Sequence, residues 1–83
     1  MCGIVGVINQ KNAPNFILSA LKTLEYRGYD SAGIYIREDK LFKTLSRVDS
    51  LKSKIASVDG IDGIGHTRWA THGFSTLNNA HPH

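Results

Sequence analysis

The start of the chain places its only cysteine directly before a short, β-branched apolar run. Residues 4–8 read Ile-Val-Gly-Val-Ile, and this pattern predicts a strand that is buried on both faces. Removal of Met1 would make Cys2 the N-terminal residue, so that one residue would carry both a thiol and a free α-amine. Such an amine has an ordinary pKa of about 7.7–8.0 and can act as a base toward the neighbouring nucleophile. The alternative is a structural cysteine that follows an initiator methionine by chance.

With 83 residues, the chain is long enough for one small domain with a modest core. Its hydrophobic content of 41% and charged content of 20% are typical of globular proteins and argue against disorder. A single cysteine excludes an internal disulfide framework and fits a reducing compartment. The apolar run at the start is too short for a signal peptide or a membrane span. We therefore expect a soluble, cytoplasmic protein with no membrane partner.

The net charge of +3 is concentrated in a basic cluster near the middle of the chain. The cluster consists of Lys40, Lys43, Arg47, Lys52 and Lys54. Glu38, Asp39 and Asp49 interrupt it, whereas a nucleic-acid-binding face needs a cleaner basic stripe with interleaved aromatic residues. We expect a solvated surface here and no nucleic-acid partner.

Hydrophobic periodicity predicts a helix after the first strand. The helix should begin at Asn12 or Ala13, with Pro14 tolerated in its first turn. One apolar face at helical spacing should point to the core. This face is formed by Ile17, Ala20, Leu21 and Leu24.

Shorter elements are expected in the rest of the chain. Residues 31–37 and 41–45 are predicted to be strands that pair around a turn at 38–40. Further along, the pattern predicts a short helix with Val48, Leu51 and Ile55 on one face, a strand over 64–68, and a loop over 69–83.

A first polar stretch, residues 25–33, is dense in groups that make directed hydrogen bonds. Arg27 and Asp30 are close enough in sequence to pair across a tight turn at Gly28. Because such a pair is more often structural than catalytic, we assign these three residues a supporting role.

A second polar stretch, residues 63–73, contains groups suited to an amino-acid ligand. Arg68 offers a planar fork of donors that matches a carboxylate, and Trp69 can form the wall of a pocket. Thr71 and His72 add short polar groups. An alternative of equal weight is a loop in which the tryptophan is buried and the arginine is solvated.

Four histidines raise the question of a metal site: His66, His72, His81 and His83. None shows the helical His pair with an intervening Glu that marks zinc proteases, and Cys2 would be the only sulfur ligand. We therefore expect no metal and no other cofactor.

Taken together, the motifs resemble one known family. Residues 1–6, 24–33 and 65–73, followed by Asn-Ala-His-Pro-His at 79–83, resemble the glutaminase domain of the glutamine–fructose-6-phosphate aminotransferases (isomerising), also called glucosamine-6-phosphate synthases. These are class II, N-terminal-nucleophile glutamine amidotransferases. The resemblance extends from the first residue to the last, with an unmatched middle from about residue 38 to 62. Other class II amidotransferases share the opening motif and the Arg-Gly turn, and they are an alternative.

The resemblance implies an α+β fold, the stacked-sheet αββα sandwich of N-terminal-nucleophile enzymes. It also implies that the thiolate of Cys2 attacks the side-chain amide of glutamine, with the α-amine as base, and that water then releases glutamate from a thioester. By the same resemblance Arg68 would clamp the substrate carboxylate, and His81 would lie near the site. Trp69, Thr71 and His72 would shape the pocket and its covering loop.

In the family, the released ammonia passes to a sugar isomerase domain that converts fructose 6-phosphate to glucosamine 6-phosphate. Residues 1–83 would be the N-terminal portion of the glutaminase domain, without the isomerase domain, the Asn-Gly oxyanion hole or the Asp that binds the substrate amine. We therefore expect an incomplete glutaminase that acts on L-glutamine, weakly or not at all alone, with a missing isomerase domain or a full-length homologue as possible partner. A small basic binding module and a truncated product without function are the alternatives.

Overall fold

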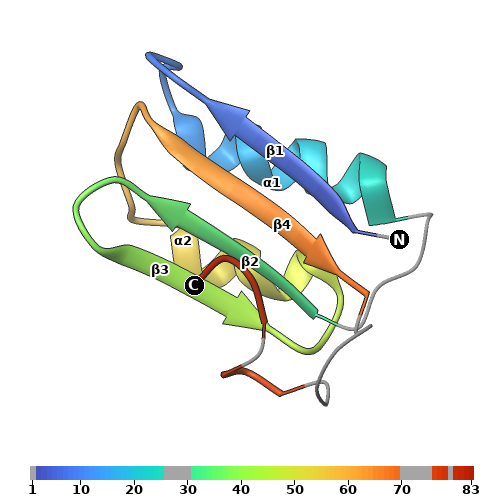
Figure 1. The fold of residues 1–83 in the computed structure, drawn as a ribbon. Coiled ribbons are helices and arrows are strands. Elements are labelled where there is room, and N and C mark those ends of the chain that lie inside the picture. Colours follow the sequence, from blue (N-terminus) through green and yellow to red (C-terminus); the bar gives the residue numbers. More distant parts are fainter. Residues whose placement is uncertain (1, 26–30, 70–75, 79) are drawn as a thin grey trace.

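An antiparallel sheet of four strands forms the fold in the computed structural model, which describes residues 2–25, 31–69, 76–78 and 80–83 (Figure 1). The strand order is β1-β4-β2-β3, so β1 and β3 are the edge strands. The elements are β1 (Gly3–Val7), α1 (Ala13–Leu24), β2 (Ser31–Ile36), β3 (Lys40–Thr44), the 3₁₀ helix η2 (Val48–Leu51), α2 (Lys52–Ile55) and β4 (Gly63–Arg68). The predicted α+β class is confirmed at this level.

Helix α1 begins where the sequence predicts, with Pro14 in its first turn. Ile17 and Leu21 are fully buried between the helix and the sheet. Gly65 of β4 allows this close packing, because a Cβ atom there would lie 3.1 Å from Leu21 Cδ1 and closer still to Ile17 Cγ2. The predicted apolar face is confirmed, although Ala20 and Leu24 at its margins are only partly buried.

The core lies on one face of the sheet, beneath both helices (Figure 1). Strand β2 contributes Ala32, Ile34 and Ile36, all fully buried, as its alternation predicts. The short helices η2 and α2 cover the same face. Their apolar residues Val48, Leu51 and Ile55 are buried, as their helical spacing predicts.

The hairpin between β2 and β3 also follows the prediction, with ends that differ by one residue from those expected. Its turn residues Glu38 and Asp39 have φ angles of 79° and 62°. Positive φ values are typical of the tight turns that join antiparallel strands. The backbone N–H of Asp39 also donates to the hydroxyl of Tyr35 at 3.1 Å.

The prediction that the first strand is buried on both faces is wrong. Ile4 is 71% exposed and Ile8 is 87% exposed, whereas Val5 and Val7 pack partly against the core. Strand β1 is an edge strand, and helix α1 covers only one of its faces. An apolar run without polar alternation cannot reveal how many layers cover a sheet.

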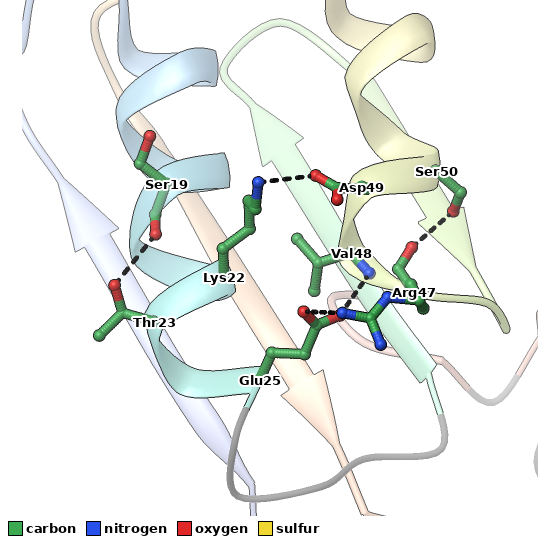
Figure 2. A network of polar contacts seen from close by, with 8 residues as sticks. All are labelled: Ser19, Lys22, Thr23, Glu25, Arg47, Val48, Asp49 and Ser50. Atoms are coloured by element: carbon green, nitrogen blue, oxygen red, sulfur yellow. Dashed lines mark hydrogen bonds and ion pairs between the residues drawn. The ribbon is translucent and has the colours of Figure 1, made fainter.

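A polar network joins the end of α1 to the start of η2 (Figure 2). The carboxylate of Glu25 accepts a bond from the backbone N–H of Val48 at 3.0 Å and another from Arg47 Nη2 at 3.2 Å. Lys22 of α1 forms an ion pair with Asp49 at 2.9 Å. Glu25 thus supplies an acceptor for an N–H group at the beginning of η2.

Candidate functional site

The start of β1 is fixed to the C-terminal end of β4. Gly3 pairs with Thr67 in the register of the two strands, and the Gly3 N–H donates to Thr67 Oγ1 at 3.1 Å. Thr67 is 2% exposed, so this bond is shielded from water. The absence of a side chain at Gly3 is required here, because a Cβ atom would lie 2.8 Å from both Leu24 Cδ1 and Thr67 Oγ1.

This pairing places the Cys2 thiol beside residue 69. The backbone N–H of Trp69 donates to Cys2 Sγ at 3.4 Å, and Sγ lies 3.9 Å from the Trp69 carbonyl oxygen. Cys2 is exposed and carries a free thiol. An exposed sulfur that faces a backbone N–H is accessible to an electrophile and has a donor aligned with it.

The sequence left open a loop in which Trp69 is buried and Arg68 is solvated, and the structure shows the opposite. Arg68 is 5% exposed, whereas Trp69 is 46% exposed. The buried tryptophan and solvated arginine of that alternative are therefore wrong. Arg68 lies at the end of β4 and pairs with Ser31 of β2, one residue before the contact between Trp69 and the thiol.

His81 lies next to β4 as well. Its ring centroid is 4.7 Å from that of His66, a strand residue two positions before Arg68. Burial lowers the pKa of His66, with a further contribution from His81. Burial likewise lowers the pKa of His81, with His83 as the next cause. Both imidazoles are therefore biased toward the neutral form.

Two contacts around the site have no counterpart in the sequence predictions. The acceptor role of Thr67 and the contact between His66 and His81 both depend on strand pairing and on the path of the C-terminal segment. Alternation along β4 places Thr67 on the core side, but no local pattern identifies the group that it binds.

Other expectations fall outside the described residues. These are the supporting turn of Arg27, Gly28 and Asp30, and the pocket residues Thr71 and His72. Where the chain is described, no three His, Cys, Asp or Glu side chains are arranged to hold a metal ion. Within the same ranges, no helix has the length and apolar character needed to cross a membrane.

Comparison with known proteins finds relatives of this chain, although no family model matches it. A protein of Streptococcus pneumoniae (strain ATCC BAA-255 / R6) is 54% identical over 86 aligned residues, covering 100% of this chain. Relatives in Streptococcus pyogenes serotype M6 and Streptococcus mutans serotype c are 56% and 53% identical, again over 100% of the chain. All three are named glutamine–fructose-6-phosphate aminotransferase [isomerizing]. The chain is related to these aminotransferases over its whole length.

The resemblance to glutamine–fructose-6-phosphate aminotransferases, read from four motifs, is thereby confirmed. The chain spans only 14–15% of the length of these relatives. The similarity includes the stretches that carry Cys2, Arg68, Trp69 and His81, since the alignments cover the whole chain.

Proposed function

We infer that this chain forms part of the glutaminase site of a glutamine–fructose-6-phosphate aminotransferase. In this proposal, residues 1–83 are part of a class II glutaminase domain, and a sugar isomerase domain lies outside them. Hydrolysis of L-glutamine supplies ammonia for the conversion of fructose 6-phosphate to glucosamine 6-phosphate in the cytoplasm. The family relationship supports this function, and the observation that carries it is the approach of the Trp69 N–H to Cys2 Sγ at 3.4 Å.

The proposed hydrolysis of glutamine uses the thiol and the α-amine of Cys2. After removal of Met1, the α-amine of Cys2 takes the thiol proton, and the sulfur attacks the side-chain amide carbon of glutamine. Collapse of the adduct breaks the C–N bond, and ammonia leaves with the proton that the amine returns. A γ-glutamyl thioester remains, and water then attacks it to release glutamate and the free thiol.

Arg68 is proposed to hold the α-carboxylate of glutamine. Its guanidinium is planar and permanently charged, and burial of the side chain strengthens its attraction for an anion. The half-exposed indole of Trp69 can form one wall of the pocket. Thr71, His72 and His81 complete the proposed pocket, while Arg27, Gly28 and Asp30 are proposed to support it.

The finer fold expectation, an αββα sandwich, is part of the same proposal. Ile4, Leu41 and Ile64 are exposed apolar residues. The strand registers place all three on the sheet face opposite to the helices. A second sheet stacked on this face would remove them from water. This exposed face supports the sandwich arrangement.

The test is intact-mass spectrometry of the purified chain before and after treatment with an electrophilic glutamine analogue. We expect a mass that lacks one methionine, a single adduct on Cys2, and protection by glutamine. Cys2→Ser should give no adduct. Arg68→Met should weaken the glutamine protection, whereas Lys52→Met, which removes an exposed cation, should not.

Two outcomes would contradict the proposal. One is retention of Met1, because an acylated Cys2 nitrogen has lost its basic lone pair. The other is a thiol that reacts no faster than free cysteine and that glutamine does not protect. Retention of Met1 would favour the small binding module with a structural cysteine. An unreactive and unprotected thiol would mean that residues 1–83 hold the motif without a working pocket.

A further inference from the structure

Three imidazole rings form a column on the sheet face opposite to the helices. His66 of β4 contacts His81 with ring centroids 4.7 Å apart and planes tilted by 36°. His81 stacks on His83 with centroids 4.4 Å apart and planes at 15°. The column therefore joins the central strand β4 to the C-terminal segment, residues 80–83, which crosses in front of the sheet (Figure 1).

Residues 81 and 82 of this segment pack directly against Gly33 of β2. A Cβ atom at Gly33 would collide with the carbonyl oxygen of His81 and would lie 2.9 Å from Pro82 Cδ. Ala80 is fully buried, and Pro82 is buried as well. The C-terminal segment is thus packed against the sheet in van der Waals contact.

The side chains that act on the charge of His66 and His81 in this column are cationic or are imidazoles. Nδ1 of His66 and Nδ1 of His81 are both buried, and neither has a hydrogen-bond partner among the described residues. The charged side chains that face the pair are Arg68 of β4 and Lys43 of β3, and the imidazole of His83 lies beside them. Strand β2 contributes the neutral Ser31 hydroxyl, which is also buried and unpaired within the described part. Protonation of His66 or His81 would add a cation near Arg68 and Lys43.

We propose that His66 and His81, with the His83 ring stacked on His81, form a proton-sensitive clasp. It holds residues 80–83 against Gly33 while the rings of His66 and His81 are neutral and releases them when this pair is protonated. The neutral rings can stack, whereas two imidazolium rings in contact repel one another. This inference concerns the docking of the segment and does not rest on the glutaminase proposal.

The direction of the pH dependence follows from linkage. The docked state lowers the pKa of His66 and of His81 below the ordinary value of 6.5. The released segment therefore binds protons more readily than the docked one. Docking is fully favoured above about pH 6.5 and weakens as the pH falls from there through the lowered pKa values.

The test is an NMR titration of the 83-residue chain from about pH 8 to about pH 5, a range that spans histidine titration. It follows the imidazole resonances together with the backbone amides of Gly33 and Ala80. We expect the two amides to shift with one common midpoint below pH 6.5, shared by the rings of His66 and His81. His81→Phe keeps an aromatic ring in the column but removes its proton site, so it should reduce the amide changes. The control Asp62→Asn removes a carboxylate that titrates in a more acidic range, and the midpoint should stay where it is.

The clasp would be disproved by amides of Gly33 and Ala80 that do not respond to pH, or that respond equally in His81→Phe. If His81→Phe does not fold, the titration of His66 and His81 in the native chain still tests the proposal. Independent titration of His66 and His81, each near its ordinary pKa, would overturn the proposal.

Discussion

The backbone N–H of Trp69 lies 3.4 Å from the sulfur of Cys2, although 67 positions separate the two residues in sequence. The contact follows from the antiparallel register of β1 and β4, in which Gly3 faces Thr67. Pairing of β1 with β4 thus brings two motifs that are far apart in sequence next to each other. The geometry of the thiol should therefore be sensitive to the bonds that fix this register.

Thr67→Val should destabilise the chain by about 1–3 kcal/mol, because the Gly3 N–H would lose its acceptor in a buried position. Loss of this bond should also loosen the start of β1 and change the alkylation rate of Cys2. Urea denaturation and thiol labelling measure the two effects. Thr67→Ser is the matched control, since it keeps the hydroxyl and loses only a methyl group, at a cost of about 1 kcal/mol. Equal stability of the two variants would show that the hydrogen bond contributes little.

Gly65→Ala should destabilise the chain by about 1–3 kcal/mol, since the added methyl group would overlap Ile17 and crowd Leu21. In an Ile17→Ala background the same substitution should cost less, because Cγ2 of Ile17, the atom nearest to the new methyl group, is then absent. The midpoint of urea denaturation measures both changes.

Gly6→Ala is the matched control on the neighbouring strand. A Cβ atom there would lie 3.9 Å from Ile64 Cγ2, which is an ordinary van der Waals distance. We expect almost no change in stability. A loss as large as that of Gly65→Ala would mean that glycine is needed in these strands for a reason other than the packing of α1.

Local elements of the fold are well predicted because their signals are local. The helical spacing of Ile17 and Leu21, the proline in the first turn of α1 and the alternation along β2 each depend on a few neighbouring residues. Burial of Ile4 and Ile8 was predicted wrongly, because it depends on which layers cover an edge strand. That information is not contained in an apolar run.

The sequence indicates which residues are candidates for the site, but not how they are buried or which of them lie close together. The chemistry of Arg68 makes it a candidate carboxylate ligand, and this role stays a prediction; its burial depends on the pairing of β4 with β2. Its nearness to Cys2 depends on the pairing of β1 with β4, which are more than 50 residues apart. Family resemblance groups Arg68 and Trp69 with Cys2, whereas composition and periodicity do not; the contact between Trp69 and Cys2 agrees with this grouping.

Glu25→Ala should cost about 1–3 kcal/mol of stability, because the Val48 N–H at the start of η2 would lose its acceptor (Figure 2). Glu25→Gln keeps an acceptor oxygen for this N–H and should cost less. Lys22→Met removes the ion pair with Asp49, in which both side chains are about half exposed, and should have little effect. Thermal unfolding of the three variants ranks these effects. A larger loss of stability in Lys22→Met than in Glu25→Ala would contradict the importance of the Glu25 carboxylate as acceptor for the Val48 N–H.

Asp62 should give the chain an acid-sensitive contribution to stability. The backbone N–H of Asn9 donates to its Oδ1 at 2.7 Å and Arg37 donates to its Oδ2 at 2.8 Å, and these bonds lower its pKa from 3.8, the first more than the second. Because the unfolded chain takes up this proton more readily, the contribution is present above about pH 3.8 and is lost as the pH falls through the lowered value.

Asp62→Asn should therefore flatten the fall in urea midpoint between about pH 4 and about pH 2.5, relative to the native chain. Arg37→Met should flatten it only in part, since the Asn9 N–H remains as the larger cause of the lowered pKa. The clasp of His66 and His81 acts in a separate window below about pH 6.5, so the difference between variant and native curves isolates the carboxylate. If the urea midpoints of Asp62→Asn and of the native chain fall in parallel with pH, the bonds from Asn9 and Arg37 do not make stability depend on the protonation of Asp62.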